Sequence, residues 1–464
     1  MIIQKKDVYK YLVIFLLIHL FIWTLVPSIV NTNLPLDTIE ALGWSNKLQL
    51  GYDKYPPVFP VFIELFYFIF GNKDWAYYLL SQIFVITSFF IIFKLSNLFL
   101  KNEIHSLLSI LLLEGIYFYN FTTPELNAFL CQFPFLAATA FFAWKSIKHN
   151  DNKNWILFGV FSGLAALTYY LSLYLLASLG LFFIYIIFKT KEFNYKYFLA
   201  LVSFIIILLP HLIWVMDNDY SSIRYAFYRS FDDPLSDLSA YEFLKRLLYP
   251  FIFLGKQIGL LIPVFIMIFS ITKSVKVKIN YKDKKLIFLF FIAVVPIILM
   301  FFTSLIMGTR IRTMWMTSFY LFTGLFFIYF YQLKIKIKNL KSFFKVFLFL
   351  FIISPVLYYF VAYTQNNKRT NYPGKEISQI VQKEWNKNFS NNIEIVFGDG
   401  WINGGWYAGN LSYHLKSRPK RVDEIGNNIE VGTVIIKGFN EINKCNGVKY
   451  QIEPFNDICM FGKK

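Results

Sequence analysis

Long apolar runs separated by short polar stretches occupy most of the chain as far as Tyr363. A helix that crosses a bilayer needs about 20 mostly apolar residues, because the hydrocarbon layer is about 30 Å thick and each residue rises about 1.5 Å. Eleven segments come close to this requirement, and the pattern predicts a spanning helix in each: 11–30, 76–100, 104–120, 126–144, 155–170, 171–188, 197–216, 249–272, 286–307, 313–333 and 343–363. The sequence therefore predicts an α-helical polytopic membrane protein. The first run is too long for a signal peptide and is expected to be retained.

Lysines mark one side of this topology. They cluster before the first segment and in alternate loops, at 5–10, 145–153, 189–196, 273–285 and 334–345. Because basic residues accumulate in cytoplasmic loops, these loops and the N-terminus are expected inside. The alternation holds only if segment 57–70, which follows Pro56 and carries Glu64, lies along the outer interface instead of crossing.

The composition shifts after Tyr363 to Asn, Lys and Gly. Strand-like runs at 393–398 and 431–438 and a helical stretch at 406–415 predict a small α/β domain over 364–464. An odd number of crossings places this domain outside the cell membrane, with 1–363 forming the transmembrane domain and 31–75 its long first outer loop. In that oxidising compartment Cys445 and Cys459 either form a disulfide or remain free thiols.

Composition narrows the classes of function. Hydrophobic residues make up 56% of the 464 residues and the formal net charge is +18. The charge is explained by the topology, because the basic clusters lie between apolar runs, and nucleic-acid binding is not expected. Neither a P-loop, a nucleophile elbow nor an HExxH motif occurs, and the three cysteines lack the spacing of a zinc site.

Candidate chemistry lies in the first outer loop. Asp37 and Glu40 stand three residues apart and share one face if 36–48 is helical. Glycosyl transfer needs a carboxylate that takes or orients the acceptor's proton while an oxocarbenium-like centre develops. In the alternative interpretation, Asp37 caps the helix and Glu40 favours its first turn. Spacing alone slightly favours the structural interpretation.

The order of residues in this loop resembles a known signature. Its elements are Asp37, Glu40-Ala41, Trp44, Leu50-Gly51-Tyr52, Lys54 and Pro56-Pro57, followed downstream by Thr123-Pro124-Glu125-Leu126-Asn127, Gly163-Leu164-Ala165-Ala166-Leu167 and Pro210-His211-Leu212-Ile213-Trp214. This order resembles the bacterial GT-C glycosyltransferases, among them the protein O-mannosyltransferases and the aminoarabinose transferases of lipid A. The resemblance implies a GT-C-like membrane fold, a polyprenyl- or dolichyl-phosphate sugar donor and Asp37 as the base or acceptor-orienting residue, supported by Glu40.

The substrate-binding candidates come partly from the resemblance and partly from the predicted positions of polar residues. Tyr55 stands where many relatives have His, and Thr168 where many have Lys, which removes one phosphate partner. All eight arginines fall on the predicted outer side, and arginine matches phosphate oxygens with a planar fork. Chance combined with a codon bias toward lysine is an equal explanation of this distribution. The substrate-binding candidates are Tyr52, Lys54, Tyr55, Glu125, Asn127, His211, Arg246, Arg310 and Arg312, although packing is the better interpretation for His211 and the helix dipole an equal one for Glu125.

Together these observations predict an integral membrane glycosyltransferase, expected in a bacterial inner membrane with its site outside. It would transfer a sugar from a polyprenyl-phosphate carrier to a lipid, glycan or protein acceptor. The sequence specifies no cofactor and leaves a divalent metal open. The rival interpretation is a membrane transporter, or a flippase or polymerase for lipid-linked glycans.

Overall fold

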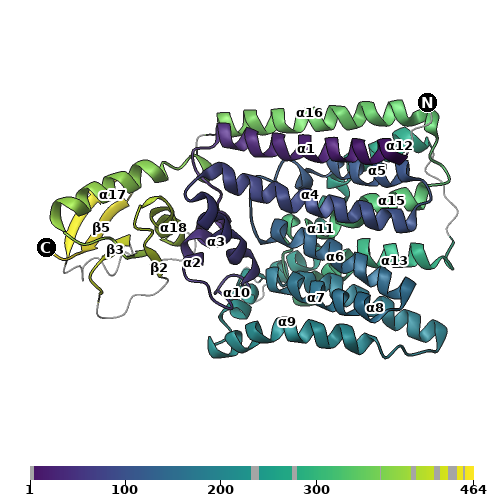
Figure 1. Cartoon of the computed structure of the whole chain (residues 1–464), viewed down its shortest axis with the longest axis horizontal. Coiled ribbons are helices and arrows are strands. Elements are labelled where there is room, and N and C mark those ends of the chain that lie inside the picture. The colour runs from purple at the N-terminus through teal and green to yellow at the C-terminus, as the bar shows by residue number, and fades with distance from the viewer. Residues whose placement is uncertain are drawn as a thin grey trace.

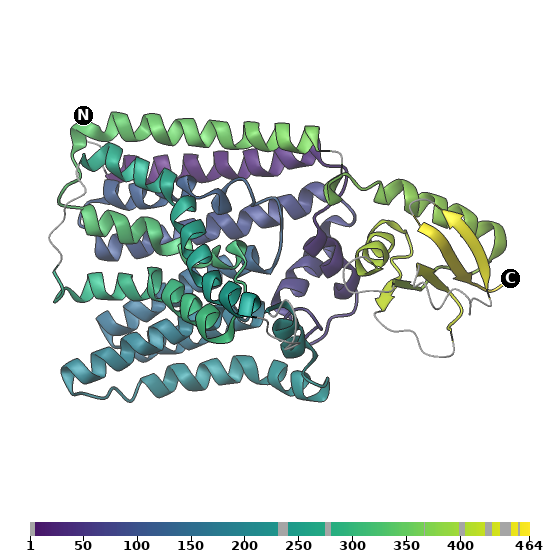
Figure 2. The ribbon, with the colours of Figure 1, turned by 180° about the vertical axis from the view of Figure 1, so that it is seen from behind.

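The computed structural model describes residues 5–230, 240–273, 280–365, 367–398, 404–422, 429–436, 447–452 and 455–464. A bundle of roughly parallel helices forms one part of the molecule, and a smaller part with a β-sheet projects from one end of it (Figure 1). The N-terminal end of the described chain lies at the opposite end of the bundle, and the view from behind shows the same separation (Figure 2).

The bundle combines long, bent and short helices. The long ones are α1 (Lys5–Val30), α4 (Asp74–Phe99), α6 (Ala128–His149), α7 (Asn152–Thr168), α8 (Ser172–Thr190), α9 (Tyr197–Asp217) and α16 (Leu340–Thr364). Two further pairs meet at a bend, α11 (Ala240–Leu260) with α12 (Ile262–Thr272) and α13 (Lys284–Ala293) with α14 (Val295–Met307). Proline in the first turn of α12 and of α14 explains both bends, because proline cannot continue the hydrogen-bond ladder of a preceding helix.

The predicted number of eleven spans is not confirmed. Among the described residues six helices are long and apolar enough to cross a membrane, or up to eight if each bent pair is one span. Segment 104–120 forms only α5 (Glu103–Leu111) and two 3-10 turns, and 313–333 forms two 3-10 turns and α15 (Thr323–Tyr331). One reason is polar: Glu114, in the first of these turns, is buried and hydrogen-bonded to His19 Nδ1 of α1 at 2.8 Å.

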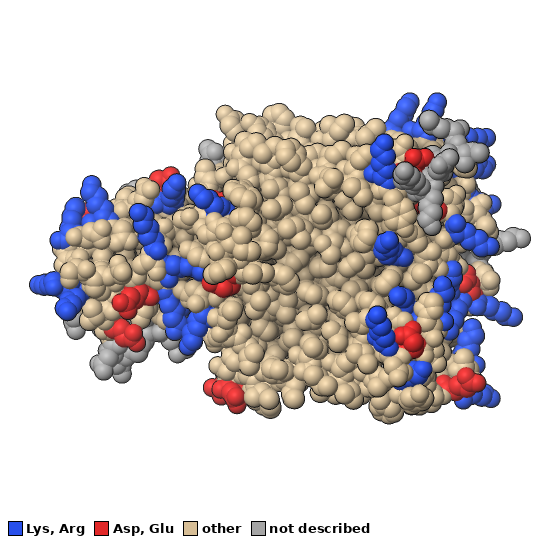
Figure 3. Space-filling model, in the orientation of Figure 1, with Lys and Arg blue, Asp and Glu red and all other residues tan. Residues whose placement is uncertain are grey.

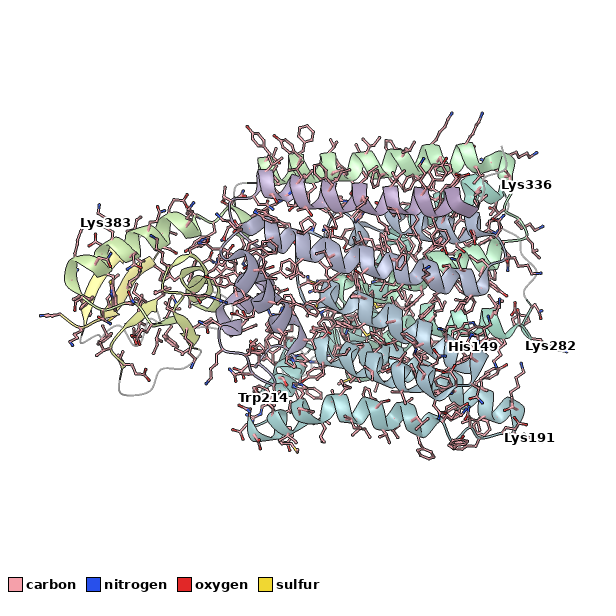
Figure 4. All side chains as sticks on the ribbon, in the orientation of Figure 1. His149, Lys191, Trp214, Lys282, Lys336 and Lys383 are labelled. Carbon is pink, nitrogen blue, oxygen red and sulfur yellow. The ribbon has the colours of Figure 1, made fainter. Side chains whose placement is uncertain are left out.

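Charge separates the two ends of the bundle from its middle. On the face shown in Figure 3, a broad band without charged side chains crosses the bundle, while basic side chains gather at the end that carries the N-terminus and again on the smaller part. His149, Lys191, Lys282 and Lys336 all lie at that first end, and Lys383 lies in the smaller part (Figure 4). The predicted lysine loops therefore share one face of the molecule.

Short helices cover the other end of the bundle. They are α2 (Leu36–Ser45), α3 (Val58–Phe70) and α10 (Ser221–Ser230). Helix α3 has 13 residues, fewer than a crossing requires, in agreement with the expectation that segment 57–70 does not cross.

The C-terminal part holds a five-stranded sheet in the order β2-β1-β3-β5-β4. Its strands are β1 (Ile395–Gly398), β2 (Lys420–Val422), β3 (Thr433–Ile436), β4 (Val448–Ile452) and β5 (Phe455–Phe461), and its helices are α17 (Gly374–Asn388) and α18 (Gly405–His414). Strand β1 pairs in parallel with β2 and β3, and β5 pairs antiparallel with β3 and β4. Strands β1 and β3 and helix α18 lie where the sequence predicted two strands and a helix, so these predictions are confirmed. Apolar residues from α17, α18 and the sheet form a common core.

Cysteines occur in both parts. Cys131 is free and buried in α6. Cys459 in β5 is disulfide-bonded, but its predicted partner Cys445 lies outside the described residues, so the pairing of these two remains a prediction.

Candidate functional site

The first outer loop folds into α2 and a turn that returns beneath it. Helix α2 begins after Pro35, which provides no side-chain cap, and Asp37 is its second residue. The carboxylate of Asp37 instead accepts hydrogen bonds from two side chains that lie 17 and 18 residues further along the chain. The capping interpretation of Asp37 is therefore wrong, because its oxygens are used in a long-range cluster.

Lys54 joins the two carboxylates. Its Nζ lies 2.7 Å from Asp37 Oδ1 and 2.6 Å from Glu40 Oε2. The Glu40 side chain is 3% exposed, whereas that of Asp37 is 28% exposed. Asp37 therefore presents an open edge to the surroundings, and Glu40 supports Lys54 from within the protein.

The pKa values of the two acids are shifted in opposite directions. Burial would raise the pKa of Asp37, but the charge and hydrogen bond of Lys54 and the hydrogen bond of Tyr55 outweigh it, and the net pKa is lowered. Burial also acts on Glu40, and there it prevails over the charges of Lys54 and Arg421, so the net pKa is raised. Asp37 is accordingly the carboxylate that stays ionised at neutral pH, and its hydrogen bonds from Lys54 and Tyr55 favour that form.

Tyr55 completes the cluster. Its hydroxyl donates a 3.0 Å hydrogen bond to Asp37 Oδ1, and its ring packs at 5.9 Å against the ring of Tyr169. Burial, followed by the negative charge of Asp37, raises the pKa of Tyr55 well above its usual value, so the hydroxyl keeps its proton. Tyrosine in place of the family-like histidine thus supplies a donor that does not titrate near neutral pH.

The rest of the loop is held against α9. His211 Nε2 bonds the hydroxyl of Tyr170 and His211 Nδ1 bonds the carbonyl of Leu50, both at 2.7 Å. Gly51 lies against the indole of Trp214, where an added Cβ would come within 2.2 Å of the ring. His211 therefore joins the loop, through Leu50, to Tyr170 between α7 and α8, and both of its ring nitrogens are used in structural contacts, as the packing interpretation expected.

Tyr52 has a similar structural position. Its hydroxyl accepts from the Gln49 amide at 3.1 Å and donates to the Lys47 carbonyl at 3.2 Å. Its ring is buried and stacks on Trp44. Tyr52 therefore shapes the turn that carries Lys54, and its role in binding substrate remains a prediction.

The predicted residues at the start of α6 have separate positions. Asn127 caps this helix, its Oδ1 accepting from the amides of Phe129 and Leu130. The pKa of Glu125 is raised, first by burial of its carboxyl group and then by the negative charge of Asp37, so Glu125 is a neighbour of the site. Asn127 is thus placed as a structural cap, and Glu125 at the margin of the acidic cluster.

The arginines are divided between two places. Arg310 and Arg312 are exposed in the segment after α14, and the stem of Arg246 lies against Gly308 in the same region. Two other arginines act on the acidic pair. The charge of Arg229 favours ionised Asp37, and the charge of Arg421 favours ionised Glu40, although burial keeps the net pKa of Glu40 raised.

Sequence reasoning missed these last two residues and Tyr225 of α10, whose side chain is within electrostatic reach of Lys54. The grouping of every arginine on the predicted outer side was the available signal. It could not say which of them fold back onto the first loop.

Among the cavities lined by described residues, two flank the part of the loop around Leu50 and Tyr52. An apolar groove of about 610 Å³ runs between the loop, α3, α6 and α7, lined by Leu48, Gln49, Leu50, Pro57, Val58, Val61, Phe62, Phe135 and Leu164. A polar cavity of about 190 Å³ lies at the boundary with the C-terminal part, lined by Trp44, Lys47, Gln49, Tyr52, Asp53, Trp214, Asn218, Lys420 and Arg421. An apolar and a polar compartment therefore open on either side of the turn that carries Lys54.

The sequence left open whether the protein binds a divalent metal ion. Within the described ranges no group of three or more His, Cys, Asp or Glu side chains lies together. Between the two acids, the ammonium of Lys54 is the cation present.

The arrangement defines a class of protein: a membrane-embedded helical bundle of the GT-C type, with an acidic pair in the loop between its first two long helices. Over 97% of both chains, the fold matches the crystal structure of ArnT from Cupriavidus metallidurans in the apo state, with a TM-score of 0.63 and 12% sequence identity. This likeness confirms the GT-C-like fold that the sequence predicted.

Within that class, residues 54–214 match the model of the dolichyl-phosphate-mannose-protein mannosyltransferase family. No curated protein sequence matches the chain. The predicted resemblance to the protein O-mannosyltransferases and the aminoarabinose transferases is thereby confirmed. The match includes Lys54 and Tyr55 of the acidic cluster and ends at Trp214, which supports the loop.

Proposed function

We propose that this protein is an integral membrane glycosyltransferase that moves a sugar from a polyprenyl-phosphate carrier to a lipid, glycan or protein acceptor on the outer face of the membrane. The observation that carries the proposal is the cluster of Asp37, Lys54 and Tyr55, which holds one partly exposed, ionised carboxylate beside a cation. The family match and the GT-C fold support it.

The apolar groove supports a lipid-linked donor. Its walls are apolar side chains from the loop, α3, α6 and α7, and it reaches Leu50 and Pro57, the residues on either side of the Lys54 turn. A prenyl chain lying in this groove would bring its phosphate to the turn. Lys54 is a point charge with three donors, suited to neutralise that phosphate as it departs.

Asp37 would act on the acceptor. As the bond between the anomeric carbon and the carrier's phosphate oxygen breaks, the acceptor's nucleophilic atom bonds to that carbon and its proton passes to Asp37. The same carboxylate stabilises the positive charge that develops on the sugar. Tyr55 and Lys54 orient Asp37, and Glu40 holds Lys54 in place.

The polar cavity offers the acceptor an approach that is separate from the groove. Lys47, Lys420 and Arg421 line it with Asp53, and Trp44 and Trp214 provide aromatic walls. A polar headgroup, glycan or peptide is compatible with this lining and a prenyl chain is not. The acceptor and donor would thus reach the cluster from two sides.

The lysine-rich end of the bundle supports the sidedness, since it lies at the end opposite α2, the helix that carries both acids (Figures 1 and 4). An outer site agrees with a lipid carrier, which delivers an activated sugar across the bilayer, and disagrees with a soluble nucleotide-sugar donor. The expected location is a bacterial inner membrane.

The test is transfer by the purified full-length protein. Radiolabelled polyprenyl-phosphate sugars would be offered as a panel with membrane lipids, glycans and peptides as acceptors, and the labelled product identified. Transfer from at least one lipid-linked donor is expected. A protein that instead moves intact lipid-linked glycans between the leaflets of proteoliposomes, without forming any glycosidic bond, would be a flippase.

A further inference from the structure

The C-terminal domain packs directly on the helix that carries both acids. Helix α18 crosses α2 where Gly409 meets Gly43, and a Cβ on Gly43 would lie 3.3 Å from the Gly409 Cα. A Cβ on Gly409 would come within 2.9 Å of the Ile39 carbonyl oxygen. Glycine on each helix permits this approach, which larger residues would prevent.

Polar contacts fix the same interface from several elements. Asn33 Nδ2 donates to Asn410 Oδ1 at 2.8 Å, and the hydroxyl of Tyr413 donates to Asp74 Oδ1 at 2.6 Å. Arg418 Nη1 donates to Glu64 Oε1 of α3 at 2.8 Å. The domain is therefore held in one position relative to the first outer loop.

Arg421 extends from β2 along the acidic face of α2. Its side chain is 7% exposed, and a Cβ on Gly43 would lie 3.0 Å from its Cδ. Its guanidinium carbon lies 4.8 Å from the ring centre of Trp44. Gly43 and Trp44 are three and four residues after Glu40, so all three lie on one side of the helix.

We propose that Arg421 is a positioning residue for the Glu40 carboxylate, so that the C-terminal domain completes the candidate active site. The role of this contact in catalysis rests on the proposed function. The electrostatic coupling between Arg421 and Glu40 does not depend on it. Arg421 would favour the ionised form of Glu40, and ionised Glu40 would hold Lys54 between the two acids.

The groups that act on Glu40 come from four elements. Lys54 lies in the turn after α2, Asp37 one helical turn earlier in α2, Arg421 in β2, and Tyr225 in α10. Lys54 and Arg421 favour the charged carboxylate, whereas Asp37 opposes it. Removing Arg421 should therefore raise the pKa of Glu40 further above its usual value.

The pH dependence of stability follows. A carboxyl whose folded pKa is raised makes the folded state less stable as pH rises above the ordinary carboxyl pKa, because the unfolded chain releases that proton first. Without Arg421 this loss should extend to higher pH. The R421Q variant should therefore lose more thermal stability at pH 8 than at pH 5, relative to wild type.

A double-mutant cycle isolates the pair. Full-length R421Q, R421K, E40Q and the two combinations with E40Q would be melted in detergent at both pH values. The pH-dependent part of the R421Q effect should disappear in the E40Q background, and R421K should couple to Glu40 more weakly than Arg421 does but in the same direction. Arg418 provides the matched control, since R418Q breaks a contact of the same interface with Glu64 and should respond equally in both backgrounds.

Transfer assays add the catalytic readout. The acidic limb of the pH profile should move up by roughly 0.5–1 unit in R421Q, with turnover recovering at higher pH, and should stay in place in R418Q. An R421Q effect that is identical in Glu40 and E40Q backgrounds would overturn the inference, and R421K carries the same test if R421Q does not fold. The melting cycle needs no substrate, so its result stands apart from the failure or success of the glycosyl-transfer assay.

Discussion

At the scale of single residues, Asp37 owes its character to partners distant in sequence. Lys54 and Tyr55 both bind its Oδ1, and Lys54 also binds Glu40. The result is one carboxylate with a lowered pKa and one with a raised pKa on the same helix. Two acids whose environments separate their pKa values are a common feature of glycosyl-transferring and hydrolysing sites.

The Asp37→Asn variant separates chemistry from structure. Asparagine still accepts the hydrogen bonds of Lys54 and Tyr55, but it cannot take a proton or stabilise a cationic sugar. Transfer should fall by about 10²–10⁴, equivalent to roughly 3–5 kcal/mol of barrier, while the melting temperature changes little. Initial rates at equal expression provide the measurement.

Asp74→Asn is the matched control for this change. Asp74 is a carboxylate at the same end of the bundle, but its partner is Tyr413 of the C-terminal part. Transfer by D74N should stay near the wild-type rate. Most of the wild-type rate in D37N would exclude Asp37 as the base and make Glu40 or Glu125 the next candidate.

At the scale of elements, the first outer loop depends on α9. The carbonyl of Leu50 is bonded by His211, and Gly51 lies flat against Trp214. These contacts place the turn that carries Lys54 next to α2. A loop without a long helix of its own thus acquires a defined shape from a spanning helix.

The Gly51→Ala variant tests this dependence. Its Cβ would lie 2.2 Å from the Trp214 ring, so either the loop or the indole must move. We expect a loss of about 1–3 kcal/mol in stability from overpacking, and a loss of transfer larger than that stability change explains. Gly180→Ala in α8 is the control, because no atom lies within 4 Å of its added Cβ. Equal transfer by the two variants would show that the loop tolerates displacement.

At the scale of the whole molecule, the bundle separates a lysine-rich end from the end that carries α2 and the C-terminal part (Figures 1 and 4). The positive-inside rule assigns the lysine-rich end to the cytoplasm. The C-terminal domain would then lie outside, against the acidic loop.

Reporter fusions test this orientation. Alkaline phosphatase fused after Tyr363 should be active, because it folds only outside the cytoplasm. A fluorescent reporter that folds only in the cytoplasm should be bright when fused after His149 and dark after Tyr363. The opposite pattern at the two positions would reverse the topology and place the site inside.

The sequence by itself determined the membrane class, the positions of most helices and the helix that carries both acids. The length of apolar runs and the alternation of lysine clusters can be read locally from the sequence. They predict membrane helices well, because a chain that spans lipid must satisfy its backbone hydrogen bonds internally and few structures do so. The number of eleven spans is not confirmed, because apolar length does not show where a helix is interrupted: segment 104–120 is broken into α5 and two 3-10 turns, and Glu114 in the first turn bonds His19 of α1.

Only the tertiary structure decided the roles within the site. Spacing could place Asp37 and Glu40 on one face, but it could not choose between a helix cap and a cluster with Lys54, because that choice depends on where a turn 17 residues away returns. Arg421 comes from a different domain, and Arg310 and Arg312, which sequence favoured, are exposed elsewhere. Sequence periodicity reports which residues share an element, whereas the distance between two elements is set by how they pack.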